Sequence, residues 1–72
     1  MKDESREYVM GLLATMMVQD RATASGRDFV DVFREFRRSR TFEMLFDEST
    51  GLWMNGPDYI SEEYDDEIAL SL

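Results

Sequence analysis

The stretch RDFVDVFREFRR, residues 27–38, has the clearest helical pattern in this 72-residue chain. Its apolar residues recur at intervals of three and four: Phe29, Val32, Phe33 and Phe36. That spacing places them on one face of an α-helix, which a neighbouring element must cover. The opposite face carries charge, in Asp31, Arg34, Glu35 and Arg38. We therefore predict a helix over about residues 27–38 whose aromatic face lies in the core.

A longer apolar segment precedes this helix. Its main stripe repeats at intervals of four, in Tyr8, Leu12 and Met16, and is flanked by Val9, Leu13 and Met17. This pattern predicts a helix of about residues 4–20 with a broad apolar face. Met10 and Val18 fall off the main stripe, and burial on two sides or a dimer seam would accommodate them. Residues 21–26 then read as a linker, with Ser25 and Asp28 resembling a capping box for the next helix.

The C-terminal half contains two shorter patterns. Thr41 is placed to cap a helix of residues 42–47, whose inward residues would be Phe42, Leu45 and Phe46. Asn55-Gly56-Pro57 marks a turn, and Pro57 suits the first position of a further helix. That helix would turn Ile60, Tyr64 and Ile68 inward. The segment 52–54 is too short to assign. Together these patterns predict an all-α fold, a compact bundle of three to four short helices forming a single domain over residues 1–72.

Composition excludes several classes of function. The chain has neither His nor Cys, the side chains that most often serve as catalytic base, nucleophile or zinc ligand. Asp47-Glu-Ser-Thr-Gly begins like a calcium loop but lacks the required spacing of acidic residues. We therefore expect no enzyme activity, no catalytic residue, no cofactor and no metal.

Cysteine usage and hydropathy bear on location. The absence of Cys fits a reducing compartment. The most apolar run, residues 9–18, is about half the length that a membrane span needs. The segment MKDESREY before it is acidic, unlike the start of a signal peptide. These features predict a cytoplasmic protein without a membrane partner.

The charges are segregated along the chain. Residues 1–40 hold eight basic and seven acidic side chains, for a net charge of +1, whereas residues 41–72 hold nine acidic and no basic ones, for −9. Five of the acids fall within six positions: Glu62, Glu63, Asp65, Asp66 and Glu67. Like charges three or four positions apart destabilise a helix. This favours a binding role for the acidic helix, although a solvated face that keeps a small protein soluble is the alternative.

Basic residues gather at the end of the aromatic helix, in Arg34, Arg37, Arg38 and Arg40. Arg suits planar recognition of carboxylates. We expect these residues to pair with the acidic helix, within one molecule or between two. Phosphate contact is the alternative, but a net charge of −8 makes nucleic acid an unlikely partner. Trp53 and Met54, beside the turn at residues 55–57, are candidates for locking that loop or for an interface hot spot.

The chain has an apolar helical segment, Tyr8 to Met17, followed by the segment Ser25-Gly-Arg-Asp-Phe-Val-Asp-Val-Phe. This pattern resembles small uncharacterised bacterial helical domains encoded beside toxin–antitoxin genes. The resemblance covers residues 8–36 and implies a small intracellular accessory protein, with an antitoxin-like role as one option.

Three hypotheses for function follow. The first is a small acidic module that binds a basic protein through its C-terminal helix, as an antitoxin or a nucleic-acid-mimic inhibitor would. The second is a homodimer or larger homo-oligomer that joins the Arg-rich helix of one chain to the acidic helix of another. The third is a nucleic-acid accessory protein acting through Arg34–Arg40.

Overall fold

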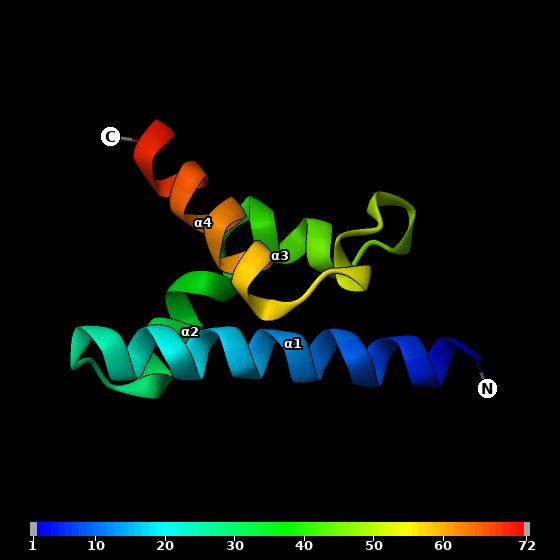
Figure 1. Ribbon diagram of the computed structural model, residues 1–72, viewed down its shortest axis with the longest axis horizontal. Coiled ribbons are helices and arrows are strands. Elements are labelled where there is room, and N and C mark those ends of the chain that lie inside the picture. Colours follow the sequence, from blue (N-terminus) through cyan, green and yellow to red (C-terminus); the bar gives the residue numbers. More distant parts are fainter. Residues whose placement is uncertain (1, 72) are drawn as a thin grey trace.

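The computed structural model describes residues 2–71, with side chains from residue 5 onward, and is all-α over that range. Its elements are α1 (Lys2–Ser25), α2 (Phe29–Arg37), α3 (Arg40–Leu45), the short 3-10 turns η1 (Glu48–Thr50) and η2 (Leu52–Met54), and α4 (Pro57–Ser71). Helix α1 runs along one side of the molecule, and α3, α4 and the two turns lie on the other side of it (Figure 1). The predicted helical bundle is confirmed, although α1 is far from short.

The predicted linker at residues 21–26 is wrong, because α1 continues through Ser25. The helix ends at Gly26, which takes a left-handed conformation with φ 71°, and the Arg27 N–H donates to the Ala22 carbonyl over 3.1 Å. This is the Schellman arrangement that glycine favours at helix ends. The predicted capping box is wrong too, since the Ser25 hydroxyl donates back to the Arg21 carbonyl (2.8 Å).

The buried face of α1 also differs from the prediction. The stripe of Tyr8, Leu12 and Met16 is exposed, at 72%, 45% and 42% of each residue's surface. The residues that pack against the other helices are Met10, Ala14, Met17, Val18 and Ala22. The alanines explain the difference, because they continue the line of Met10 and Val18 at intervals of four while lacking the bulk that marks a core face in sequence. Their small side chains let neighbouring helices approach α1 closely.

Phe36 of α2 lies at the centre of the core and is fully buried. Its ring packs edge-on against Phe42 of α3 and Tyr64 of α4, with ring centroids 5.5 and 5.0 Å away. Ile60 and Leu45 are buried beside it. The predicted aromatic face of α2 is confirmed, with Val32 and Phe36 buried and Phe29 and Phe33 packed partly against the same cluster.

Helix α3 begins two residues earlier than predicted, at Arg40 instead of residue 42. Ser39 is its N-cap and accepts a hydrogen bond from the Phe42 N–H over 3.0 Å, so the assignment of Thr41 as cap is wrong. Leu45 is buried as predicted, whereas Phe46 is exposed and stacks on Phe42 with centroids 4.6 Å apart.

The predicted start of α4 at Pro57 is confirmed. Ile60 and Tyr64 are buried, but Ile68 is exposed because the C-terminal turns of α4 extend past the body of the bundle. None of the described helices is long and apolar enough to cross a membrane.

We predict that Phe36→Ala lowers the free energy of unfolding by about 3–5 kcal/mol, because it opens a cavity where three helices meet. A 72-residue domain has little stability to spare, so the variant should be largely unfolded at 37 °C. Urea denaturation followed by circular dichroism measures the effect. The control Val30→Ala lies on the exposed face of the same helix and should change stability by less than about 0.5 kcal/mol. Equal losses in the two variants would contradict this core.

Candidate interaction surface on the C-terminal helix

The five clustered carboxylates of α4 do not share one environment. Glu67 points at the start of α3, where it accepts hydrogen bonds from the Arg40 N–H (2.8 Å), the Thr41 N–H (2.9 Å) and the Thr41 hydroxyl (2.8 Å). The first N–H groups of a helix have no partner within it, and the helix dipole favours negative charge there. Glu67 therefore caps a helix that lies 26 residues earlier in the chain.

The environment of Glu67 sets its protonation. Burial acts to raise its pKa, but the hydrogen bonds from Arg40 and Thr41 and the charge of Arg40 act against burial. The balance leaves the pKa of Glu67 below its ordinary value of 4.5. Glu67 is thus an anion at neutral pH, and both of its carboxylate oxygens already accept hydrogen bonds from the start of α3.

Asp65 is used inside the molecule as well. The Arg21 guanidinium of α1 donates to Asp65 (2.7 Å) and to the Ser61 hydroxyl (3.2 Å). Its planar group also lies over the Tyr64 ring, 4.7 Å from the centroid, which adds a cation–π contact. Arg21 was not predicted as a site residue, because nothing in its sequence neighbourhood marks it as the residue that reaches α4.

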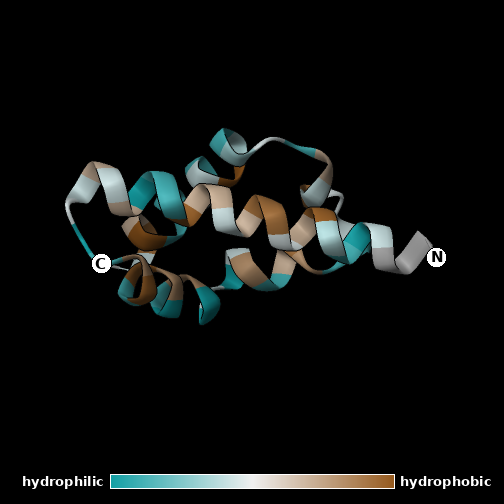
Figure 2. Cartoon of the chain, turned by 90° about the horizontal axis from the view of Figure 1, so that it is seen from below, coloured by the Kyte–Doolittle hydropathy of each residue, from teal (hydrophilic) through white to brown (hydrophobic). Residues whose placement is uncertain are grey.

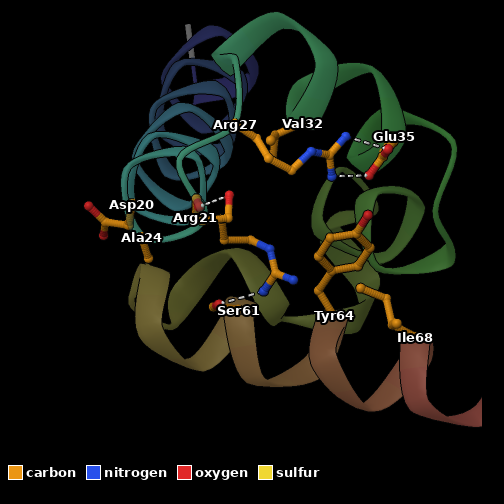
Figure 3. A pocket seen from close by; sticks show the side chains of 10 residues that line it. Asp20, Arg21, Ala24, Arg27, Val32, Glu35, Ser61, Tyr64 and Ile68 are labelled. Atoms are coloured by element: carbon orange, nitrogen blue, oxygen red, sulfur yellow. Dashed lines mark hydrogen bonds and ion pairs between the residues drawn. The ribbon is translucent and has the colours of Figure 1, made fainter.

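Arg21 borders an open cavity of about 670 Å³ between the end of α1, α2 and α4 (Figure 3). Across the cavity, Arg27 binds Glu35 through two parallel contacts of 3.0 and 2.6 Å. Burial is the main cause that raises the pKa of the Tyr64 hydroxyl in its wall. Both guanidinium groups are therefore already engaged with carboxylates of the same chain, which leaves the cavity without a free charge for an anionic ligand.

The other three acids, Glu62, Glu63 and Asp66, form a strip on the outer side of α4. Within the part of the chain that the structure describes, none of them takes part in an ion pair or a hydrogen bond to another side chain. Asp66 follows Glu62 by four positions and Glu63 by three, so all three project from adjacent turns of one face. We call Glu62, Glu63 and Asp66 the acidic strip.

Apolar groups accompany the acidic strip. Tyr59 lies one turn before it and Leu70 one turn after it, and both are exposed, Leu70 at 87%. Glu63, Asp66 and Leu70 also border a groove of about 380 Å³ between α4 and α3, whose far wall includes Met44 and Arg40. The surface thus combines net negative charge with solvent-accessible hydrophobic area.

The Arg-rich segment forms no ion pair with the acidic strip within one molecule. Arg34 lies 3.4 Å from Asp31 of its own helix. Arg37 and Arg38 are exposed, and neither forms an ion pair with a described residue. Arg40 alone of this segment lies beside α4, where its N–H donates to Glu67 and the residue borders the same groove as Glu63 and Asp66. The structure brings Arg21, not Arg34, Arg37 or Arg38, to the acidic helix.

Trp53 and Met54 have different environments. Trp53 is half-buried against the core, and its indole N–H donates to the Glu48 carbonyl (3.3 Å), which fits the predicted locking of the loop. Met54 is exposed at 71% and stays a candidate contact residue.

No three described acidic residues are gathered in a way that could hold a metal ion. Comparison of the chain with family models, with curated proteins and with solved structures finds no match.

We predict that Glu67→Gln destabilises the fold by about 1–2 kcal/mol, since it removes the negative charge that caps α3. A carboxylate with a lowered pKa stabilises the folded state above its ordinary pKa, and this contribution is lost as the pH falls through the folded value. The difference in unfolding free energy between wild type and variant should therefore narrow as the pH drops below 4.5. Urea denaturation over a pH series measures it.

The neighbouring change Asp66→Asn provides the matched control, because Asp66 caps nothing in the structure. Its effect should stay within about 0.5 kcal/mol of zero at every pH. Similar losses for the two variants would show that Glu67 is not a specific cap.

Proposed function

We propose that this protein is a small cytoplasmic interaction module that binds a basic protein through the acidic strip of α4. The observation that carries the proposal is the division among the carboxylates of α4. Two of the five are consumed by contacts within the chain, and the remaining three lie together on one face without a basic partner among the described residues.

The acidic strip destabilises its own helix by charge repulsion, and this cost supports a function for it. Like charges at these spacings repel one another and weaken the helix that bears them. Arg21 relieves the repulsion at Asp65 on the inner side, but no described cation forms an ion pair with Glu62, Glu63 or Asp66. A bound Lys or Arg side chain would do so, and the relief of repulsion would add to the affinity of the complex.

The surroundings of the acidic strip indicate the kind of partner. Tyr59 and Leu70 offer exposed apolar area on either side of the charges, and energetically dominant contacts usually combine apolar burial with charge. We therefore propose a basic protein whose Lys or Arg side chains flank a small apolar patch. Inhibition of a nucleic-acid-binding protein, in the manner of an antitoxin or a nucleic-acid mimic, fits this chemistry and the net charge of −8.

The proposal predicts that the triple change Glu62→Gln, Glu63→Gln and Asp66→Asn abolishes capture of the basic partner. Immobilised wild type and variant are incubated with lysate of the source cells, and bound proteins are identified by mass spectrometry. Loss of three charge contacts should weaken binding by at least about tenfold at low salt. Raising the salt should weaken binding by the wild type until it approaches that of the variant.

The matched control is Glu7→Gln, Asp20→Asn and Glu43→Gln, which removes the same net charge from exposed positions off α4. The control should capture the partner as the wild type does. Equal losses of capture for the two triple variants would show that only the net charge of the protein matters. Capture that survives the change on α4 would refute the acidic strip as the site.

A further inference from the structure

Helix α1 has a second apolar face, which points away from the core. The four large apolar residues on it are exposed: Tyr8, Val9, Leu12 and Met16. They lie on the side of α1 opposite to the buried residues Met10, Ala14, Met17 and Val18. Seen from below, α1 crosses the view in front of the other elements, with hydrophobic colour on its central turns (Figure 2).

The centre line of this face has a regular spacing. It runs through residues separated by alternating steps of four and three: Ser5, Val9, Leu12, Met16, Gln19 and Thr23. Alternating steps of this kind form the seam by which two helices pack in a coiled coil. All six residues are uncharged in a chain that is 33% charged. We call these six residues the outer seam.

The outer seam suits a long helix better than any compact surface. It extends over 19 of the 24 residues of α1, or roughly 27 Å at 1.5 Å per residue. A basic partner of the kind proposed for α4 would find no carboxylate on it. The partner must instead offer a straight, uncharged line of similar length with apolar side chains at its centre, and α1 of a second copy offers one, with Val9, Leu12 and Met16 between polar ends.

Charge and side-chain size select an antiparallel pairing. In the register where Leu12 of each chain meets Met16 of the other, the largest side chains fill the middle and the small polar Ser5 and Thr23 meet at the two ends. Arg6, which also binds Glu48 of its own chain, then lies near the partner's Asp20. A parallel pairing would instead hold Arg6 and the partner's Asp20 at opposite ends of the seam, 14 residues or roughly 21 Å apart.

We propose that this protein forms an antiparallel homodimer through the outer seam of α1. The dimer extends beyond the proposed binding function, because α4 lies on the other side of α1 (Figure 1) and keeps its acidic strip exposed in both chains. The outer seam has six residues per chain, against roughly 20–30 on each side of a standard interface, so we expect dissociation constants on the order of 10–100 μM.

The salt dependence of this dimer has a definite sign. Each chain carries a net charge of −8, so two chains repel, and salt screens the repulsion without weakening apolar contact. Dimerisation through the outer seam should therefore strengthen when salt rises from about 0.02 to about 0.5 M. Self-association of the Arg-rich helix with the acidic helix would weaken over the same range.

Sedimentation equilibrium over a range of protein concentrations tests the proposal. The average mass of the wild type should rise from one chain toward two, and at least about tenfold higher concentration should be needed for the double change Leu12→Ser and Met16→Ser. Both residues are exposed in the single chain, so the variant should keep its circular dichroism spectrum. The control Val30→Ser with Leu70→Ser removes exposed apolar groups elsewhere and should dimerise as the wild type does.

Disulfide trapping then tests the direction of the helices, since the chain contains no Cys. Chains with Ser5→Cys mixed with chains with Thr23→Cys should oxidise to the mixed dimer, while either variant alone should give little crosslinking. Three results would overturn the proposal. They are a mass of one chain at every concentration, association that weakens with salt, and crosslinking mainly between chains that carry the same Cys variant. Because the acidic strip is not involved, failure here leaves capture of the basic partner untouched.

Discussion

The contact between the Glu67 carboxylate and the first turn of α3 fixes the arrangement of the C-terminal half. Helix α3 has six residues, too few to be stable in isolation, and its free N–H groups need acceptors. Ser39 supplies one, and Glu67 supplies the others from a distant part of the chain. Together with the packing of Phe36 between Phe42 and Tyr64, this contact sets the rotational orientation of α4 about its own axis.

That orientation determines which carboxylates of α4 remain without an ion pair or a capping contact. The inner side presents Ile60 and Tyr64 to the core, and Asp65 and Glu67 to cationic or N–H groups. The outer side carries Glu62, Glu63 and Asp66. They repel one another and form no ion pair with a described residue. A surplus of negative charge that looks uniform along the sequence is therefore divided by the fold into a structural part and an available part.

The apolar residues of α1 are likewise divided by the fold into a buried set and an exposed set on opposite sides of the helix. From the sequence, helix type and approximate position were predictable wherever apolar spacing was strong, as in α2 and at the Pro57 start of α4. The buried face of α1 was not, because Ala14 and Ala22 contribute to a core by being small, and apolar pattern alone favours the bulkier Tyr8, Leu12 and Met16. Long-range polar contacts were equally hidden, since nothing near Arg21 or Glu67 in the chain indicates Asp65 or the start of α3.

The division of the acidic helix can be measured directly by following the side-chain carboxyl signals of isotope-labelled protein by NMR during titration with a short lysine-rich peptide. We predict that the signals of Glu62, Glu63 and Asp66 shift together and saturate, while those of Asp65 and Glu67 stay close to their starting positions. Shifts of similar size across all five carboxylates, or across acids such as Glu7 and Glu43 on other helices, would contradict the existence of a distinct acidic strip.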